Sequence, residues 1–275
     1  TIWVLITIVF FLVRLMPGEP FTSAKLTPEV KANMEAYYGF DKPMIVQYGT
    51  YMANLLQGDF GYSMKYTNRT VNDLIGETFP YSADLGIRGL VMAVSIGLIL
   101  GIISARNRGK KIDFFCVIVA VLGTSIPDFI MGAVLQYFFG IKWGLFPVAR
   151  YEGIEYTILP AFALSFYTLA SVSRIMRASM LEVTSQDYIK TARSKGVSEL
   201  RITCKHQIRN AIMPVMTVMG PTVASVLTGT FVIESIFAIP GMGRHYVQSV
   251  SNNDYSMVLG MTVFYGIFLV LCNLI

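Results

Sequence analysis

The sequence predicts an all-α protein with six transmembrane helices. Of its 275 residues, 54% are hydrophobic and only 14% are charged, and the mean hydropathy is +0.56. Soluble domains average about 25% charged residues. Apolar segments of about 20 residues, the length that crosses a bilayer, recur along the chain, and most charged residues lie between them.

Six apolar segments define the expected transmembrane spans. Segments containing proline, glycine and charged residues separate them. The expected spans are residues 2–16, 85–105, 112–139, 157–175, 211–236 and 256–275. A long polar segment, residues 18–80, follows the first span, and within it we expect helices over residues 27–38 and 44–56.

The second expected span carries two local patterns. Asp84 and Arg88 are spaced i, i+4, so we expect them to pair near its outer end. Gly97 and Gly101 form a GxxxG pattern, which lets another helix approach closely.

The basic residues are distributed unequally between the loops. Residues 106–111 contain four basic residues and no acidic one, and residues 174–210 contain eight basic residues against three acidic ones. Residues 140–156 and 237–255 contain three basic residues between them. Since Lys and Arg accumulate in cytoplasmic loops, we expect the first two loops and both termini in the cytoplasm. The segment 18–80 is then external.

The first and last residues of the sequence lead to a separate prediction. It starts at Thr1 without Met and stops at Ile275 within an apolar segment, so we expect both ends to be trimmed. A bacterial cell membrane is the expected location.

The sequence contains no pattern typical of an enzyme active site, a metal site or a nucleotide site. Its cysteines, Cys116, Cys204 and Cys272, form no disulfide framework. No His, Cys or carboxylate cluster has metal-ligand spacing, and no G-x4-GK[ST] pattern occurs. We therefore expect no catalytic residue and no cofactor in this chain. The net charge of +5 does not indicate nucleic acid, because the basic residues lie in loops between apolar spans.

The longest polar, basic segment covers residues 182–210, between the fourth and fifth spans. Thr184-x-x-Asp187 is typical of a capping box, so we expect a helix to begin near position 185. Gly196 should end that helix, since glycine accepts the left-handed conformation found there. Ser198 can cap a second helix that runs to about position 209. The expected result is two short helices joined at a glycine turn.

The residues of this segment resemble the EAA loop of permease subunits of ABC importers, most closely the oligopeptide and dipeptide branch. Lys190 and Thr191 stand where the loop's name has Glu and Ala, whereas Ala192 and Gly196 match. The resemblance is carried by Tyr188-Ile-Lys-Thr-Ala-Arg-Ser-Lys-Gly196, followed by Arg201, His206, Asn210 and Pro214.

Four further motifs of that family occur in the family's order. The long external segment after the first span is typical of the first of the two permeases in such systems. The motifs are Arg14-Leu-Met-Pro-Gly-Glu-Pro20, Gly58-Asp-Phe-Gly-Tyr-Ser63, Ser125-Ile-Pro-Asp-Phe129, and Val232 to Gly243, which resembles VExxFxxPGxG.

The resemblance implies one transmembrane domain over residues 1–275, whose EAA-like loop docks on a cytoplasmic ATPase. It implies four kinds of partner: a second homologous permease, two ATPase subunits that bind ATP and Mg, an extracellular or periplasmic peptide-binding protein, and membrane lipid. The residues implied in ATPase coupling are Asp187, Tyr188, Ala192, Lys195, Gly196, His206 and Asn210.

Three polar residues have more than one interpretation. Asp128, after Pro127, can line the translocation pathway or be satisfied by backbone groups that the proline frees. Glu234 can contact the pathway or the binding protein, but bracing of the turn at Pro240 is the favoured interpretation. For His206, hydrogen-bonded packing is favoured over a pH switch.

Alternative functions stay open at this point. A permease of the same family for nickel, sugar or another small solute is one alternative, since a permease sequence hardly encodes its cargo. An autonomous ion-coupled symporter should show inverted repeats and broken helices, and we find no convincing repeat. A membrane sensor should carry an appended signalling domain, which the sequence does not contain.

Overall fold

The structure, a computed structural model, describes residues 2–15, 37, 39, 41–66, 69–227 and 231–274. The regular secondary structure of this part of the chain is helical, apart from an isolated bridge between Tyr62 and Thr70. The expected all-α class is confirmed. The helix expected over residues 27–38 lies outside the described residues, apart from position 37, whereas the one expected over 44–56 is present as α3 (Met44–Leu56).

The chain forms two compact units. Unit 1 comprises Thr1–Pro80 and Gly241–Leu271, and unit 2 comprises Tyr81–Pro240 and Cys272–Ile275. The long helix α4 (Val71–Arg106) contributes residues 71–80 to unit 1 and the rest to unit 2.

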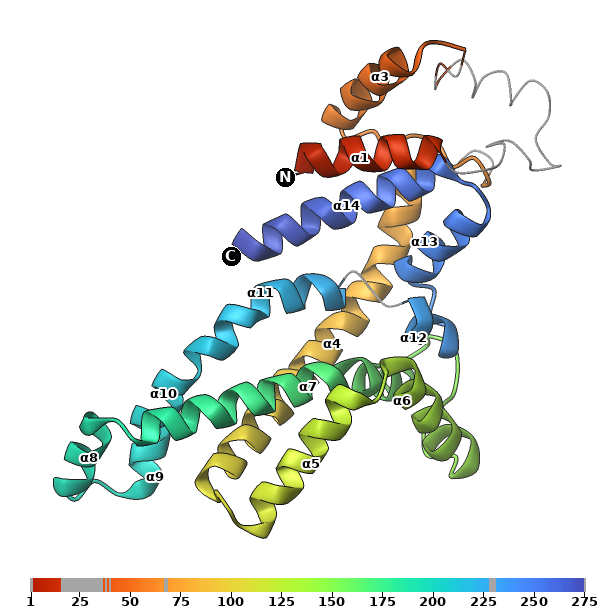
Figure 1. The fold of residues 1–275 in the computed structure, drawn as a ribbon. Coiled ribbons are helices and arrows are strands. Elements are labelled where there is room, and N and C mark those ends of the chain that lie inside the picture. Colours follow the sequence, from red (N-terminus) through yellow and green to blue (C-terminus); the bar gives the residue numbers. More distant parts are fainter. Residues whose placement is uncertain are drawn as a thin grey trace. The chain divides into compact units, whose positions relative to one another are not determined.

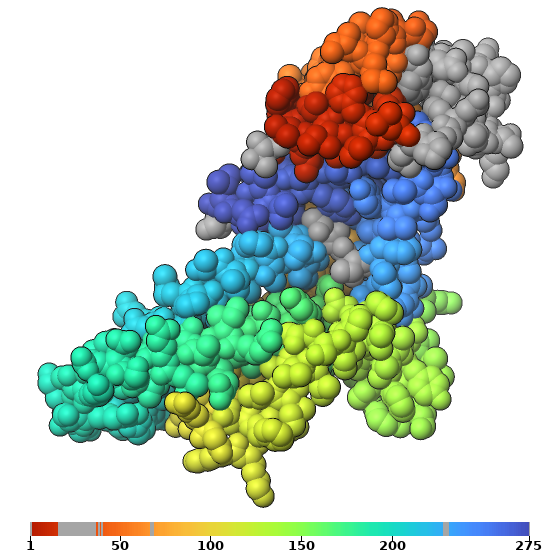
Figure 2. Space-filling model, in the orientation of Figure 1, coloured from red at the N-terminus to blue at the C-terminus, as the bar shows by residue number. Residues whose placement is uncertain are grey.

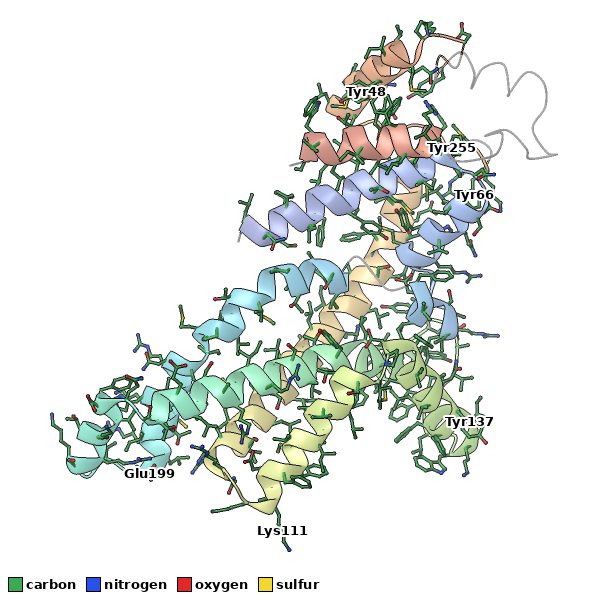
Figure 3. The ribbon with its side chains drawn as sticks, in the orientation of Figure 1. Tyr48, Tyr66, Lys111, Tyr137, Glu199 and Tyr255 are labelled. Atoms are coloured by element: carbon green, nitrogen blue, oxygen red, sulfur yellow. The ribbon has the colours of Figure 1, made fainter. Side chains whose placement is uncertain are left out.

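Unit 1 contains α1 (Ile2–Arg14), α3, α13 (Met242–Ser251) and most of α14 (Tyr255–Leu274). The aromatic ring of Phe10 on α1 is fully buried and meets the ring of Tyr48 on α3. Figure 3 labels Tyr48, Tyr66 and Tyr255, three of the aromatic residues of this unit. Burial of such rings, together with the aliphatic residues around them, stabilises unit 1.

The buried carboxylate of Asp254 starts α14. It accepts hydrogen bonds from the backbone N–H of Met257, at 3.2 Å, and of Met64, at 3.0 Å, and from the hydroxyl of Ser63. Asp254 therefore caps the first turn of α14 and ties the Gly58–Ser63 motif to it.

Unit 2 is built around α7 (Glu155–Thr184), which Figure 1 shows between α5 (Lys111–Ser125) and α11 (Met213–Leu227). It also packs against α6 (Asp128–Leu135) and α12 (Phe231–Ile236). Among the candidate spans, α7 is the most buried. A helix apolar on most sides is expected at the centre of a bundle.

Glycines bring α4 and α5 close to α7. A Cβ atom added at Gly97 would lie 2.8 Å from the carbonyl oxygen of Leu169, and one at Gly101 would lie 2.7 Å from that of Ser173. On α5, a Cβ at Gly123 would lie 2.5 Å from the Cβ of Ala170. The GxxxG pattern of α4 therefore allows a close approach between helices, and the helix that approaches it is α7.

Within the described residues, four stretches are long and apolar enough to cross a membrane: α4, α7, the stretch that holds α11 and α12, and α14. A fifth span results if α5 and the pair formed by α6 and the π-helical η1 (Gln136–Lys142) count as one, and α1 is a shorter apolar helix. The expected six spans thus stay a prediction.

Two expected spans differ in detail from the helices of the structure. The third span is not continuous, because its two halves are bent by 108° between Ser125 and Asp128. Pro127 stands at this break and has no N–H with which to continue the helix of α5. The second span begins within a helix that starts at Val71, so residues 71–80 of the expected external segment are helical. Pro80 lies inside that helix.

Candidate functional site

The basic segment forms two short helices after α7. These are α8 (Asp187–Ser194) and α9 (Glu199–Ile202), and the chain then continues through the π-helical η2 (Thr203–Gln207) and α10 (Ile208–Ala211) into α11. In Figures 1 and 2 these teal elements occupy the end of unit 2 that lies beyond the C-terminus of α7. We call residues 185–202 the elbow segment.

Gly196 closes α8 in a left-handed conformation, with φ of +73°. Its N–H donates to the carbonyl of Arg193 at 2.9 Å, and the N–H of Val197 donates to that of Ala192 at 3.2 Å. This pair of hydrogen bonds is the Schellman motif, which satisfies the last carbonyls of a helix. The expected glycine turn is confirmed. A Cβ at Gly196 would meet nothing within 4 Å, so backbone conformation, not space, selects glycine here.

The expected capping box was wrong. Thr184 belongs to α7, where its hydroxyl donates to the carbonyl of Met180 at 2.6 Å. The residue before α8 is Gln186, and its side chain makes no capping hydrogen bond. Ser198 does precede α9 with an extended backbone, but its hydroxyl caps nothing. A hydroxyl within a helix often donates to the carbonyl four residues earlier. The Thr184 hydroxyl makes this bond to Met180 and is therefore not available to cap α8.

An ion pair spans the Gly196 turn. Nε of Arg193 lies 2.7 Å from Oε1 of Glu199, and Nη2 lies 3.2 Å from Oε2. This hydrogen bonding to Arg193 lowers the pKa of the Glu199 carboxyl, so the pair stays charged at neutral pH. A two-point contact of this kind holds the end of α8 to the start of α9.

The elbow segment contains buried residues, and a hydrogen bond links the helix that follows it to the end of α7. Ile189 on α8 and Ile202 on α9 are fully buried. The buried Gln207 donates to the hydroxyl of Thr184 at 3.0 Å and so links η2 to the end of α7. The two isoleucines are isolated apolar residues in a polar segment, which is the signal that could have identified them from the sequence.

The residues expected to couple to an ATPase divide into two groups. Those on α8 and the turn lie together, and most of them are exposed: Asp187, Tyr188, Lys195 and Gly196, with Ala192 partly buried. His206 and Asn210 lie beyond α9, on η2 and α10.

The favoured interpretation of His206 was wrong in one respect. Its imidazole makes no hydrogen bond within the described residues, whereas its backbone carbonyl accepts one from the side-chain amide of Asn210 at 2.8 Å.

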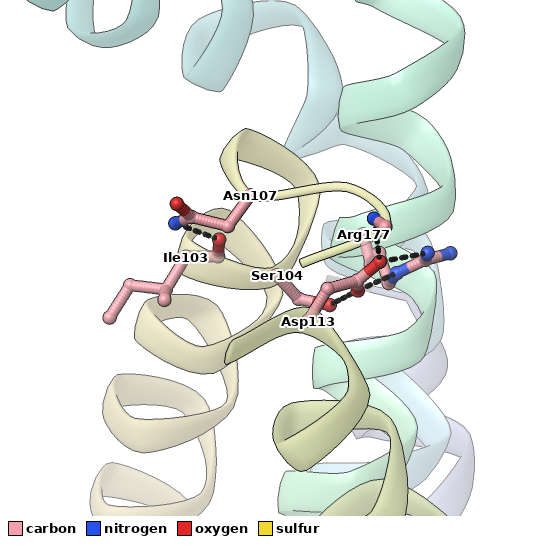
Figure 4. A network of polar contacts seen from close by, with 6 residues as sticks. Ile103, Ser104, Asn107, Asp113 and Arg177 are labelled. Atoms are coloured by element: carbon pink, nitrogen blue, oxygen red, sulfur yellow. Dashed lines mark hydrogen bonds and ion pairs between the residues drawn. The ribbon is translucent and has the colours of Figure 1, made fainter. Parts of the chain in front are cut away.

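A buried ion pair joins α7 to the turn between α4 and α5 (Figure 4). Nε and Nη2 of Arg177 lie 2.8 and 2.9 Å from the two carboxylate oxygens of Asp113, which is only 5% exposed. Ser104 donates to the same carboxylate at 2.5 Å, and the N–H of Gly109 does so at 2.9 Å. Four donors satisfy the buried charge, as such a charge requires. We call the pair of Asp113 and Arg177 the α7 brace.

Neither member of the α7 brace was among the expected site residues. Asp113 and Arg177 lie 64 positions apart, and nothing local in the sequence pairs them.

A polar cavity of about 270 Å³ lies between the elbow segment and the ends of α4 and α7. Its charged walls are Arg106, Arg193 and Glu199, with Thr184 and Gln207 beside them. Figure 3 shows Glu199 and Lys111 at the same end of unit 2, away from Tyr137. This end thus gathers the two most basic loops of the sequence.

The two pathway candidates have different environments. Asp128 is the first residue of α6 and is partly exposed, and its carboxylate makes no hydrogen bond within the described part of the chain. The structure therefore does not show the Asp128 carboxylate hydrogen-bonded to backbone groups that Pro127 frees. Glu234 is fully buried, and its Oε1 accepts from Ser82 at 2.7 Å.

The turn after α12 depends on the backbone of Glu234. Its carbonyl accepts from the N–H of Ile239 at 2.8 Å, next to Pro240. The bracing interpretation of Glu234 agrees with these contacts.

At the other end of unit 2, the expected pair of Asp84 and Arg88 is present. Nε of Arg88 lies 2.8 Å from Oδ2 of Asp84. The hydroxyl of Tyr151 donates to the same oxygen, and the ring of Tyr81 meets that of Tyr151 edge-on. Burial, followed by the hydrogen bond to Asp84, raises the pKa of Tyr151, so its hydroxyl stays a donor at neutral pH.

Comparison with known proteins places these features in a family. Residues 97–275 match the family described as the inner membrane component of binding-protein-dependent transport systems. The dipeptide transport system permease protein DppB of Bacillus subtilis (strain 168) is 45% identical over 98% of this chain and 88% of its own. The oligopeptide transport system permease protein OppB of Haemophilus influenzae is 42% identical over 100% of this chain and 91% of its own.

Solved structures share the fold. A crystal structure of an amino acid ABC transporter with histidines has a TM-score of 0.56 at 17% identity, covering 73% of this chain and 90% of its own. An inward-facing structure of the MetNI methionine ABC transporter has a TM-score of 0.53 at 15% identity, covering 74% of this chain and 93% of its own. The family match and the relatives agree with the motifs in the sequence, and the chain belongs to the inner membrane permeases of binding-protein-dependent ABC importers.

Proposed function

We propose that this chain is the permease subunit of an ATP-driven importer for oligopeptides or dipeptides. Relatives 37–45% identical over nearly the whole chain are named for dipeptide or oligopeptide transport, which supports this cargo over nickel, sugar or another small solute. A second homologous permease forms the other half of the pathway, and an extracellular or periplasmic binding protein delivers the peptide. Both termini lie in the cytoplasm.

Energy enters through two partner ATPase subunits, which bind ATP and Mg²⁺, and this chain binds no cofactor. The elbow segment docks in a groove of one ATPase, with Asp187, Tyr188, Ala192, Lys195 and Gly196 at the contact. The observation that carries this assignment is the Schellman turn at Gly196, because it gives the exposed α8 a defined direction. The side chain of Tyr188 is 44% exposed on α8, and aromatic residues are enriched at protein interfaces.

Force then passes from the elbow segment to the spans. α8 packs against α9, α9 continues into η2, and Gln207 on η2 is hydrogen-bonded to Thr184 at the end of α7, so we expect a movement of α8 and α9 to reach the end of α7. The α7 brace carries that displacement to the turn between α4 and α5. Packed helices have few alternative arrangements, so a shift at the elbow changes the opening of the spans instead of dissipating locally.

A reconstituted transporter tests this function. The complete complex, in vesicles with the binding protein outside and ATP inside, should accumulate a labelled dipeptide or tripeptide. Vesicles that lack this subunit should not, and the subunit purified alone should not hydrolyse ATP. Uptake of nickel or a sugar without uptake of peptide would refute the proposed cargo. ATP hydrolysis by the subunit alone would refute the division of labour between the subunits.

A further inference from the structure

The Asp84–Arg88 pair has unused capacity for an anion. The guanidinium carries five N–H donors in a fork that matches a carboxylate. Nε donates to Asp84, and the guanidinium also hydrogen-bonds the Tyr151 hydroxyl, which leaves part of its five N–H donors for a further acceptor. Both side chains of the pair remain more than one third exposed, at 36% for Arg88 and 38% for Asp84.

An apolar cavity of about 270 Å³ lies directly beside this guanidinium. Arg88 is its one charged wall residue, and Asp84 does not line it. The apolar wall comes from α4 and from the first turns of α7: Ile87, Val91, Met92, Ile154, Ile158 and Ala161. We call this space the outer cavity, because it lies at the end of α7 away from the elbow segment.

The position of the pair on α4 limits what can cover it. This helix is long and apolar enough to span the membrane, and charged side chains in spans are costly against lipid. Charged groups in spans usually face a cavity, a pathway or a partner. A surface that combines a partly exposed ion pair with an apolar hollow suits a molecule that has both charge and apolar side chains.

We propose that Arg88 binds the C-terminal carboxylate of an incoming peptide through its Nη groups, while the last side chain of the peptide enters the outer cavity. Asp84, held by the hydroxyl of Tyr151, is a positioning residue that orients the guanidinium and balances its charge when no peptide is present. This inference rests on the proposed peptide transport and names the chemical group that the permease recognises.

The geometry favours the carboxylate over the peptide's ammonium group. Oδ2 of Asp84 already accepts from Nε of Arg88 and from the Tyr151 hydroxyl, so its capacity for a further cation is reduced. The cavity adjoins Arg88 and not Asp84. A carboxylate on the Nη groups places the adjacent side chain of the peptide in apolar surroundings, where its burial is favourable.

Paired peptides of one sequence, with either a free carboxylate or a C-terminal amide, provide the test. Uptake is measured in the reconstituted complex for the wild type, Arg88→Gln and Arg88→Lys. The binding protein is the same in every sample, so its own preference cancels when ratios are compared. Arg88→Gln should lower uptake of the free peptide roughly tenfold or more, the usual effect of losing a charge-assisted hydrogen bond. Uptake of the amide should change little, and Arg88→Lys should recover part of the ratio.

Two further variants separate recognition from folding. Arg150→Gln removes an exposed arginine that pairs with Glu152 at 3.3 Å, and it should leave the ratio unchanged. Val91→Trp fills the outer cavity, and it should reduce uptake of peptides ending in Phe more than of those ending in Gly. An unchanged ratio in Arg88→Gln would overturn the inference. Equal loss of both peptides, together with loss of the second permease on purification, would also overturn it and assign Arg88 to the subunit interface. If the wild type transports neither peptide, the proposed function itself fails.

Discussion

Arg177 contacts both carboxylate oxygens of Asp113, at 2.8 and 2.9 Å, and thereby ties the middle helix of unit 2 to the first turn of α5. Arg177 lies on α7, less than three helical turns before its end at Thr184. The pair is therefore placed to carry a displacement of the elbow segment to the turn between α4 and α5.

Removing one partner of this pair should destabilise unit 2. In Arg177→Met, the nearly buried Asp113 keeps Ser104 and Gly109 but loses its counter-charge. Breaking a buried pair costs about 3–5 kcal/mol, and we expect the lower part of that range because Arg177 is 30% exposed. The measurement is thermal unfolding of the purified complex.

The double variant Arg177→Met/Asp113→Leu is the control for that loss. It leaves no unpaired charge, so stability should return towards that of the wild type, while uptake per ATP hydrolysed stays low if the brace transmits force. Full uptake in the stable double variant would show that the pair serves folding alone.

Gly196→Val should disconnect the ATPase without harming the spans. A β-branched residue at φ of +73° costs about 1 kcal/mol or more, and the strain falls on an exposed turn. Expression and membrane insertion should stay near normal, while ATPase retention in a pull-down and peptide uptake should fall several-fold.

Gly144→Val is the matched control for Gly196→Val. Gly144 also has a positive φ, +61°, and also has nothing within 4 Å of an added Cβ, but it lies in the loop expected to be external. It should keep its ATPase and its uptake. Normal uptake in Gly196→Val would refute the docking role of the elbow segment.

Ala192→Asp should act on docking through charge. Ala192 is partly buried within the chain, and the proposed ATPase groove covers the rest of it. A buried unpaired carboxylate is strongly unfavourable, so ATPase retention should fall about tenfold or more. Ala192→Ser, which is small and uncharged, should change retention less than threefold. Equal retention for both variants would place Ala192 outside the contact.

Membrane orientation can be tested with single cysteines in a variant without Cys116, Cys204 and Cys272. Positions Lys110 and Ser198 should be cytoplasmic, whereas Lys65 and Arg150 should be external, because the basic loops stay inside. All four positions are exposed, so an impermeant thiol reagent can reach them from the correct side. Labelling of position 198 in intact cells would contradict the proposed orientation.

Local features of this protein were determined by the sequence alone. The spacing of apolar segments predicts the helices, and the identity of Gly196 predicts the left-handed end of α8. The i, i+4 spacing predicts the contact of Asp84 with Arg88. Each of these depends on backbone geometry within one or two helical turns, which the residues there decide by themselves.

Only the tertiary structure decided which distant groups meet. Ser82 and Glu234 are 152 positions apart, and Ser63 and Asp254 are 191 apart, yet each pair is buried and hydrogen-bonded. The glycines at 97 and 101 allow a close approach, but they do not say which helix approaches. The packing of whole helices selects partners such as these, because protein interiors are packed as densely as organic crystals. No local sequence pattern specifies which helix surfaces are complementary.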